Sequence, residues 1–580
     1  MVASVSATLR TRGLGLSALL ALPIAVVGCC SLGTKDVPTL LQNEDELTED
    51  FGFGPGPSMV AAIGKAAGWP LIFTKAETTT AGQLGAYHQR GEGSAAAGTM
   101  SSVTGSGTAI PALTGTPDKS YAVRVRVTTA GSNLAATPVV QISLDGGLTW
   151  LAAGAVTASA TPQAIGSTGL LLAFTDGTFV LNDYWTAQGA NCPTDADATG
   201  ASVPAFTGTP RDAFDVRVAV TRSATTAGDG TGAVRYSLDG GTTYAPEQPV
   251  PTSRAVVLGD SGITVTFSAA SLVDGDEYYI KTSAPVFTAA AMAASLTALR
   301  GVSVADHEGI VIAGAIDATY FDEITTAHDA LIAASKPRYI IGHARGQAAA
   351  IYGETAAQWA SALLGATPGF SGANANMVLV AAGECTKKDG LHGDAVLRRS
   401  VLFDVAARLA AIDVAEHPGR VRSGPLDIET LLHDLADSTL VSLDTQGFIG
   451  AQSIVGVEGF YATRRTRAAA GSDFDSIMRV RVMCFACRAA LARMVEEVNE
   501  SIPVNANGTI RADVADGIDA SVTSYMTREL GRRVSSVSVQ VSRTADLVST
   551  STLPFKVRVV PLGYSEAITL DLGYTLARSA

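Results

Sequence analysis

Two short motifs carry residue types that could perform covalent chemistry, and the first is Gly259-Asp-Ser-Gly262. A serine in such a loop can act as a nucleophile when a histidine takes its proton. No histidine lies between His88 and His307 in the sequence. Since the serine has no general base nearby in the sequence, we do not expect hydrolysis from this loop.

The second motif, Cys484-Phe-Ala-Cys487, has the spacing of redox and zinc-binding cysteine pairs. A redox pair needs its first cysteine at a helix N-terminus, and a zinc site needs a second pair of ligands. This motif instead falls inside an amphipathic helix that we expect over about 473–499. The remaining histidines of interest are too far apart in sequence to suggest a ligand set: His392, His417 and His433. We therefore expect core cysteines, no metal, no cofactor and no enzyme activity.

The clearest pattern in the sequence is a duplication. The block Thr-Gly-Thr-Pro occurs at 114–117 and at 207–210, an offset of 93 (207 minus 114), and a second block occurs at 143–150 and 237–244, an offset of 94 (237 minus 143). The offset between the two copies changes by only one residue, as an insertion or deletion in a loop would change it. Such a pattern indicates a repeated domain. In copy one the serine motif is replaced by Gly166-Ser-Thr-Gly169, which is a further argument against a serine nucleophile.

The second block of each copy has a structural explanation. Ser143-Leu-Asp-Gly-Gly-Leu-Thr-Trp150 fits the Ser-x-Asp-x-Gly-x-Thr-Trp box of sialidase-type propellers, and 237–244 repeats it with a final tyrosine. In that class of protein the box braces a hairpin, because its aspartate accepts hydrogen bonds from turn amides. Two boxes are too few for a propeller, so we expect a brace without catalysis.

Composition excludes some classes of function. Of 580 residues, 47% are apolar and 16% charged, which predicts a globular chain of about three to five domains whose weakly charged surface favours assembly. The net charge of −13 argues against binding nucleic acid, which needs clustered lysine and arginine. Apart from the N-terminal run, no stretch approaches the ~18 apolar residues of a membrane span, so we expect no membrane insertion.

The N-terminus allows two interpretations. Arg10 and Arg12 precede an apolar run over 14–27 and then Cys29, which is typical of a lipoprotein signal peptide with its lipidated cysteine. The other interpretation is a buried strand over 24–28 followed by a turn. Six scattered cysteines are too few for a disulfide framework, which favours folding in a reducing compartment.

Hydrophobic periodicity predicts the elements. Each copy alternates on period two, as in Val123, Val125 and Val127, which predicts antiparallel β-sandwiches, and a Gly/Ala/Ser/Thr linker over 91–109 precedes them. After about residue 290 strands and helices alternate, which predicts a mainly parallel sheet. The other expected strands lie at 24–28, 70–73, 309–313, 338–341 and 377–380, the helices at 58–67 with Ser58 as N-cap, 321–334, 356–364, 473–499 and 511–531, and a closing hairpin joins 555–560 to 567–572.

With the duplication set aside, the two ends resemble the tail sheath proteins of contractile bacteriophages and related injection systems. The resemblance depends on the order of several segments: 24–34, 37–40, Phe51-Gly-Phe-Gly-Pro-Gly56, Leu443–Ile449, Val455–Arg464, Asp473–Val482 and Val559–Leu570. It implies an α/β (α+β) sheath core assembled from both chain ends, with two tandem inserted all-β sandwich-like domains. The expected boundaries are 1–105 (arm and first part of the core), 106–198 (repeat one), 199–290 (repeat two), 291–470 (core) and 471–580 (inner domain with the long helix and terminal arm).

The same resemblance implies a helical homo-oligomer around an inner tail tube protein, with baseplate and tail terminator proteins at its ends, in a virion tail assembled in the bacterial cytoplasm. Subunits would exchange terminal strands; the candidate residues are Val5, Leu9, Phe555, Val557, Val559, Ile568, Leu570 and Leu572. Candidate tube-facing residues lie on the long helix: Arg479, Arg481, Arg488 and Arg493. The alternative is a secreted or lipid-anchored surface protein whose β-domains bind carbohydrate.

Overall fold

The computed structural model describes residues 22–85, 88–89, 100–116, 123–144, 150, 156–166, 168–187, 200–202, 204–301, 306–347, 355–365, 369–373, 375–467 and 472–564. Within this part of the chain, residues 413–417 and 478–564 form a small compact unit, and the other residues form a large unit. None of the helices in these ranges is long and apolar enough to cross a membrane.

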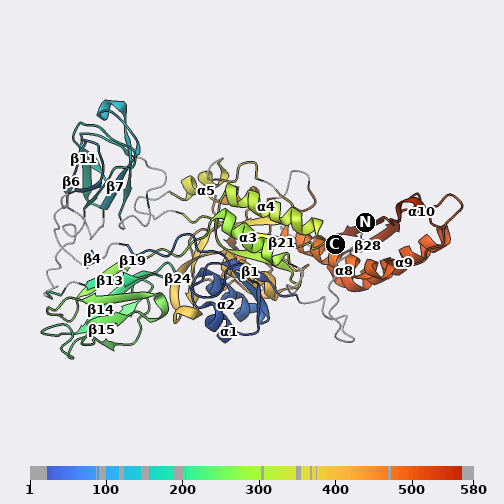
Figure 1. The fold of residues 1–580 in the computed structure, drawn as a ribbon, viewed down its shortest axis with the longest axis horizontal. Coiled ribbons are helices and arrows are strands. Elements are labelled where there is room, and N and C mark those ends of the chain that lie inside the picture. Colours follow the sequence, from blue (N-terminus) through green and yellow to red (C-terminus); the bar gives the residue numbers. More distant parts are fainter. Residues whose placement is uncertain are drawn as a thin grey trace, which may run out of the picture. The chain divides into compact units, whose positions relative to one another are not determined.

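A six-stranded sheet forms the centre of the large unit (Figure 1). Its order is β2 (Thr39–Leu41), β3 (Leu71–Lys75), β1 (Ala25–Gly28), β20 (Gly309–Ile316), β21 (Tyr339–Ala344) and β22 (Val378–Ala381). All neighbours are parallel except β2, which pairs antiparallel to β3. The strand and helix alternation thus predicted the parallel sheet correctly, and β1 is an inner strand buried along its whole length.

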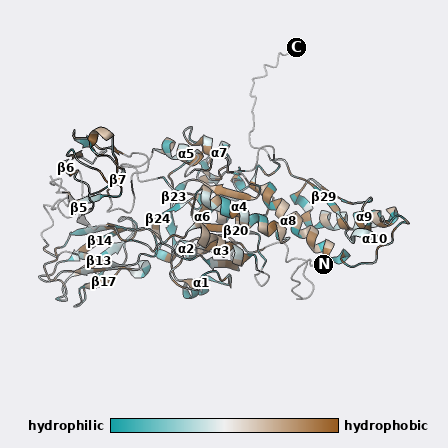
Figure 2. Cartoon of the chain, turned by 45° about the horizontal axis from the view of Figure 1, so that its top comes forward, coloured by the Kyte–Doolittle hydropathy of each residue, from teal (hydrophilic) through white to brown (hydrophobic). Residues whose placement is uncertain are grey.

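Helices cover this sheet because its strands are apolar on both faces (Figure 2). On one face, α3 (Ala289–Leu299) and α4 (Ala318–Ala333) share an apolar cluster with β1 and β20, and α5 (Ala356–Leu364) adds Trp359 to it. Helix α2 (Pro55–Ala67) contacts β1, β3 and β20, and it also packs on α6 (Leu402–Ala411). The expected helices over 321–334 and 356–364 are confirmed.

One N-terminal prediction is corrected, and one N-terminal helix was not predicted. Helix α2 begins at Pro55 with Gly54 as its cap, so Ser58 is a buried residue inside the helix and not its N-cap. Proline suits the first turn of a helix, where its missing amide proton has no intrahelical partner. The preceding acidic segment, for which no helix was expected, is α1 (Glu44–Phe51), and the Asn43 side chain caps it by accepting a hydrogen bond from the Glu46 amide at 2.8 Å.

Both copies of the duplication consist of antiparallel strands, as their alternation predicted. Copy one has a five-stranded sheet with the order β5-β12-β7-β8-β9 and a three-stranded sheet β10-β11-β6. Copy two has β16-β15-β14-β19-β4, where β4 is His88–Gln89, and β13-β18-β17. Each copy has its own apolar cluster. The bounds in copy one are β5 (Ser101–Thr104), β6 (Pro111–Gly115), β7 (Val123–Thr129), β8 (Val139–Ser143), β9 (Val156–Thr157), β10 (Gln163–Ala164), β11 (Leu170–Phe174) and β12 (Tyr184–Ala187). Those in copy two are β13 (Pro204–Gly208), β14 (Asp215–Arg222), β15 (Ala233–Ser237), β16 (Gln248–Pro249), β17 (Ala255–Val257), β18 (Ile263–Phe267) and β19 (Glu277–Lys281).

The two copies are nested in the chain and not simply consecutive. Strand β4 (His88–Gln89) precedes copy one, yet it pairs with β19 at the edge of the five-stranded sheet of copy two. Isolated bridges continue this pairing between Leu84 and Thr282 and between Thr80 and Val286. The corresponding edge position of copy one is filled by β5, so part of the expected 91–109 linker is a strand. The chain therefore starts copy two, completes copy one, and returns to finish copy two.

The large unit also contains two smaller sheets. Strands β23 (Glu384–Asp389), β24 (Ala395–Ser400) and β25 (Thr430–Leu431) form one, with β23 in the middle. Strands β26 (Ala451–Ser453) and β27 (Phe460–Ala462) form a hairpin, and α7 (Val441–Thr445) precedes it.

The small unit combines helices with a closing hairpin. Helix α8 (Ile477–Met494) leads into it, α9 (Ala512–Leu530) follows, and β28 (Ser536–Val541) pairs antiparallel with β29 (Phe555–Val560). The described partner of 555–560 precedes it in the chain. The predicted partner, residues 567–572, lies outside the described ranges, so that pairing stays a prediction. The short helix α10 (Leu547–Thr550) connects the two strands.

Candidate functional site

The first candidate site is the β28–β29 hairpin, because in a two-stranded sheet each strand has one outer edge. Its register runs from Ser536 opposite Val560 to Val541 opposite Phe555. In the described part of the chain no third strand pairs with it, so one edge of each strand presents backbone groups without a strand partner. Such edges accept a further strand.

Helix α9 supports the inner face of this hairpin. Val541 is buried in an apolar cluster with Ala515 and Ile510. The Asp519 carboxylate accepts a hydrogen bond from the Val541 amide at 2.6 Å, and the Arg543 guanidinium pairs with Asp519 at 3.6 Å and also with Asp516. The Asp519 carboxylate thus occupies the outer edge of β28 at Val541, while the outer edge of β29 has no strand partner among the described residues.

The predicted strand residues fall on the supported face. Phe555, Val557 and Val559 are half-buried, and they alternate with exposed Lys556 and Arg558. The other candidates for strand exchange lie outside the described residues: Val5, Leu9, Ile568, Leu570 and Leu572. Their part in assembly stays a prediction from the sequence.

The prediction of tube-facing arginines is corrected for two of the four residues. Arg481 is 1% exposed and Arg488 is 9% exposed, so neither side chain is available to a partner at the surface of this chain. Arg481 donates to the Asp413 carbonyl at 3.4 Å, and the Arg488 guanidinium lies 6.0 Å from the Phe485 ring centre. Helix α8 is buried on most of its circumference, which the expected basic face did not anticipate.

The other two arginines are half-buried. The Arg493 guanidinium pairs with Glu496 at 2.9 Å and with Glu497 at 2.8 Å, within its own helix end. These contacts neutralise its charge locally, and Arg479 makes contacts of its own. Both remain candidates for the tube-facing role.

A second candidate site joins the second repeat to the sheet of β23 and β24. The Arg399 guanidinium on β24 donates to both Asp212 oxygens at 2.9 and 2.8 Å, and to Asp389 at 2.6 Å. His392 lies beside them, with its Nε2 3.9 Å from Asp212 Oδ2. All four side chains are buried, and we call this set, Asp212, Asp389, His392 and Arg399, the joint.

The charges of the joint shift the pKa of its members. Burial opposes ionisation of Asp389, but the Arg399 guanidinium outweighs it and holds the pKa of that carboxyl below its usual value. The pKa of Arg399 is raised despite its burial, because Asp212 and Asp389 flank it. Asp389 and Arg399 are therefore both in their charged forms at neutral pH.

The aspartate box of copy two is a brace, as predicted, and it also reaches the joint's sheet. The Asp239 carboxylate accepts hydrogen bonds from Ser237 Oγ at 2.7 Å and from the Thr243 amide and hydroxyl, both at 2.8 Å. It accepts a further hydrogen bond from the Val396 amide of β24 at 3.0 Å. The equivalent Asp145 of copy one lies outside the described residues.

The serine motif forms a turn and has no free hydroxyl. Ser261 is fully buried; its Oγ donates to the Leu258 carbonyl at 2.7 Å and accepts from the Ile263 amide at 3.2 Å. Copy one builds the same turn with Thr168, whose hydroxyl donates to the Ile165 carbonyl at 2.5 Å. The hydroxyl braces a tight loop in both copies, which confirms the structural interpretation.

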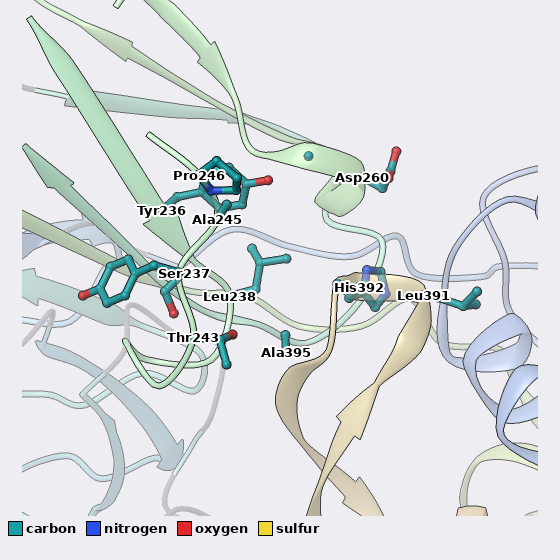
Figure 3. A pocket seen from close by; sticks show the side chains of 13 residues that line it. Tyr236, Ser237, Leu238, Thr243, Ala245, Pro246, Asp260, Leu391, His392 and Ala395 are labelled. Atoms are coloured by element: carbon teal, nitrogen blue, oxygen red, sulfur yellow. The ribbon is translucent and has the colours of Figure 1, made fainter. Parts of the chain in front are cut away.

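Tertiary structure does bring a histidine near this loop, although the sequence shows none. A cavity of about 310 Å³ lies where the second repeat meets the turn after β23 (Figure 3). Its lining includes Tyr236, Thr243, Asp260, Leu391 and His392. Because the serine hydroxyl beside it is engaged in the turn, the cavity is not a hydrolase site.

The cysteine motif lies within α8, as expected. Cys484 is buried, Cys487 is half-buried, and both are free thiols. Burial raises the pKa of the Cys487 thiol, which makes it a poor nucleophile. Among the described residues, no group of three or more His, Cys, Asp and Glu could hold a metal ion.

Sequence reasoning missed the joint, although the duplication contained a signal for it. Copy two has Arg211-Asp212 where copy one, 93 residues earlier, has Asp118-Lys119. The acidic and the basic residue thus occupy these two positions in opposite order in two otherwise matching copies. This reversal indicates that the copies face different neighbours. The partner residue on β24 could not have been identified, because it lies 187 positions from Asp212.

Two family models match the chain: DUF2586, N-terminal domain over residues 21–466, and DUF2586, C-terminal domain over residues 473–579. No curated protein matches it.

Solved structures to which the chain is similar are tail sheath proteins and sheaths of contractile injection systems. A sheath tail protein of Desulfitobacterium hafniense has 10% identity and a TM-score of 0.39, with 96% of this chain and 100% of that chain covered. One of Listeria innocua has 9% identity and a TM-score of 0.39, with 94% and 96% covered. The helical sheath of the anti-feeding prophage in its contracted state has 15% identity and a TM-score of 0.35, with 50% and 77% covered.

Proposed function

The chain belongs to the DUF2586 family, and we propose that it is the structural subunit of a contractile tail sheath, which polymerises helically around an inner tube and contracts to drive that tube through a cell envelope. The observation that carries the proposal is the β28–β29 hairpin, which packs on α9 and whose outer edge on β29 has no strand partner among the described residues. The ordered series of sheath-like segments at both ends of the sequence supports it. The subunit acts without catalysis.

Strand addition suits a polymer that must move. A strand of one copy that joins the hairpin edge of another makes a heterologous contact, and such contacts generate open helical arrays when they do not close into rings. Backbone hydrogen bonds then keep neighbours connected while the rest of each subunit rotates. The terminal segments that contain Val5, Leu9, Ile568, Leu570 and Leu572 are the donors in this proposal.

The division into two units supports the same role. The small unit consists of one short segment, 413–417, and the C-terminal part of the chain. In the proposal it is the inner part that holds neighbouring copies and the inner tail tube, with Arg479 and Arg493 as the remaining tube-facing candidates. The large unit carries the nested repeats, which we propose as outward β-sandwich domains inserted into the sheath core.

The wider assembly follows from this role. The subunit would be located in a virion tail or a related particle, assembled in the bacterial cytoplasm, with baseplate and tail terminator proteins at the ends of the sheath. Contraction would release a metastable extended array into a shorter and wider one, without nucleotide hydrolysis by this chain. Neither nucleic acid nor membrane insertion has a part in it.

Electron microscopy of the purified full chain tests the proposal. Ordered hollow tubes are expected, because the hairpin edge and the donor strands are on the same polypeptide. A chain that stays monomeric at high concentration, with or without an added tube, would contradict the proposal.

The structure does not favour the lipid-anchored alternative. A lipoprotein would lose the residues before Cys29, yet these include β1, which is paired on both sides by β3 and β20. Cys29 itself is 1% exposed. Intact-mass measurement of the N-terminus separates the two proposals, since a lipoprotein would begin at a modified Cys29.

A further inference from the structure

His392 occupies an unusual position for a titratable side chain. It ends the turn after β23, its side chain is 0% exposed, and its ring packs edge-on to Phe214 at 5.0 Å and against Phe53 at 5.7 Å. Among the described residues, neither ring nitrogen has a hydrogen-bond partner. The ring is therefore held by apolar packing, and a charge on it would have no solvation.

Charged groups from three elements act on the ring. Asp212 comes from the turn before β14, Asp389 from the end of β23, and Arg399 from β24. Both Asp212 oxygens and one Asp389 oxygen already accept from Arg399. The carboxylates that could pair with an imidazolium are thus committed to the guanidinium, whose own charge repels one.

More distant charges do not change this balance. Asp260, on the loop that also lines the cavity, attracts a proton to the ring, but its carboxylate is 62% exposed and lies 3.9 Å from the Arg211 guanidinium. Asp394, which lies on the same turn as His392, is exposed. Exposed charges are screened by water and salt, so burial of the ring dominates.

The direction of the effect follows from burial. Desolvation lowers the pKa of His392 below its ordinary value of 6.5, against the attraction of Asp389 and Asp212. An opened joint would return the ring to water, where it takes up a proton near pH 6.5. The opened form therefore binds more protons than the closed form as the pH falls below about 6.5, and acid favours opening.

We propose that the joint between the second repeat and the β23–β24 sheet opens at mildly acidic pH, with His392 as the group that takes up the proton. Asp389 does not explain opening in this range, because the Arg399 guanidinium holds its pKa below the usual value. The inference is independent of polymerisation and holds for the isolated subunit.

Amide hydrogen exchange of the full-length chain tests the proposal. The Val396 amide is the probe, because it donates across the joint's interface to Asp239. After correction for the intrinsic rate, its exchange should rise by up to about tenfold per pH unit below pH 6.5, because one proton is linked to opening. Amides of the central strands β20 and β21 should keep their protection.

Substitutions identify the responsible group. His392→Phe keeps an aromatic ring in an aromatic environment and should make Val396 exchange independent of pH over this range, and His392→Gln is the second variant if the first does not fold. His328→Phe is the matched control, since His328 is also buried with a lowered pKa but lies on α4. A flat pH profile in the wild-type chain, or an unchanged acid response in both His392 variants, would overturn the proposal.

Discussion

The Arg399 guanidinium donates one hydrogen bond to each carboxylate oxygen of Asp212, and this pair fastens the second repeat to β24. Both side chains are almost fully buried. Removing one partner of a buried pair leaves an uncompensated charge, which costs about 3–5 kcal/mol. Arg399→Met should therefore lower the free energy of unfolding of the large unit by about that amount, as measured by urea denaturation.

Arg222 offers the control for this substitution. It pairs with Glu247 at 3.1 Å, but both side chains are about half exposed. Arg222→Met should change the free energy of unfolding by less than about 1 kcal/mol. Equal effects of the two substitutions would show that the Asp212 pair does not fasten the repeat.

Asp239 should be important for stability although it has no catalytic role. Its carboxylate accepts from the Thr243 amide within the box and from the Val396 amide of β24. Burial opposes its ionisation, but these hydrogen bonds outweigh burial and hold its pKa below the usual value. Asp239→Ala should cost about 1–3 kcal/mol of unfolding free energy, measured by thermal or urea unfolding.

The same carboxylate predicts a dependence on pH. Because the folded-state pKa of Asp239 is lowered, its stabilising effect is present above the unfolded pKa of about 3.9 and is lost as the pH falls through the folded value. The difference between wild type and Asp239→Ala should therefore shrink only below about pH 4. Asp274→Ala, at an exposed position of the same repeat, is the control and should have little effect.

Arg467 is a buried arginine that has no carboxylate partner among the residues that the structure describes. Its guanidinium donates to the carbonyls of Phe370, Ala373 and Gln446 at 2.6, 3.0 and 3.1 Å, and it lies 4.8 Å from the ring centre of Phe448. Burial lowers its pKa. It connects two separate segments, the turn over 370–373 and the end of α7, to its own segment.

A lysine at position 467 should not preserve the stabilising contacts of this arginine. Arg467→Met and Arg467→Lys should both lower the free energy of unfolding by about 2–4 kcal/mol, because a lysine ammonium cannot span three carbonyls as the planar guanidinium does. Full stability of Arg467→Lys in urea denaturation would contradict this geometric explanation.

The hairpin edge gives a prediction that separates folding from assembly. Backbone N–H groups alternate in direction along a strand, so of the neighbours Val557 and Arg558 one points its N–H toward β28 and the other toward the open edge. Proline removes that donor. Of the variants Val557→Pro and Arg558→Pro, one should lower the melting temperature, and the other should keep it but fail to form tubes by electron microscopy. Normal tubes from both variants would exclude strand addition at β29.

The cysteines should be inert in the folded chain. Burial raises the pKa of the Cys30 thiol to about 12 and also raises that of Cys487, and only the thiolate reacts. In a Cys192→Ser background, which removes the cysteine outside the described residues, a thiol reagent at pH 8 should react slowly until denaturant is added. Fast reaction of Cys484 and Cys487 as a pair would instead indicate a redox function.

Several parts of the fold follow from local patterns. The duplication, the period-two alternation around Val123 and the strand and helix alternation after residue 290 are properties of neighbouring residues, and they predicted the antiparallel copies and the parallel sheet. The brace role of Asp239 and the turn role of Ser261 followed because the two copies could be compared with each other. Local hydrogen bonds and burial of one face are sufficient to determine such features.

Only the tertiary structure decided which distant segments meet. Alternation identifies β29 as a strand but does not select its partner, since any strand of matching pattern can supply the hydrogen bonds, and packing on α9 selected β28. Strand β4 is a second case, because it precedes copy one in the sequence but completes the five-stranded sheet of copy two. Arg481 is a third case: the sequence predicted it on a basic face of the helix, but α8 is buried at that position. The joint has the same cause: Asp212 and Arg399 meet because the second repeat packs on the β23–β24 sheet, and sequence spacing carries no record of that contact.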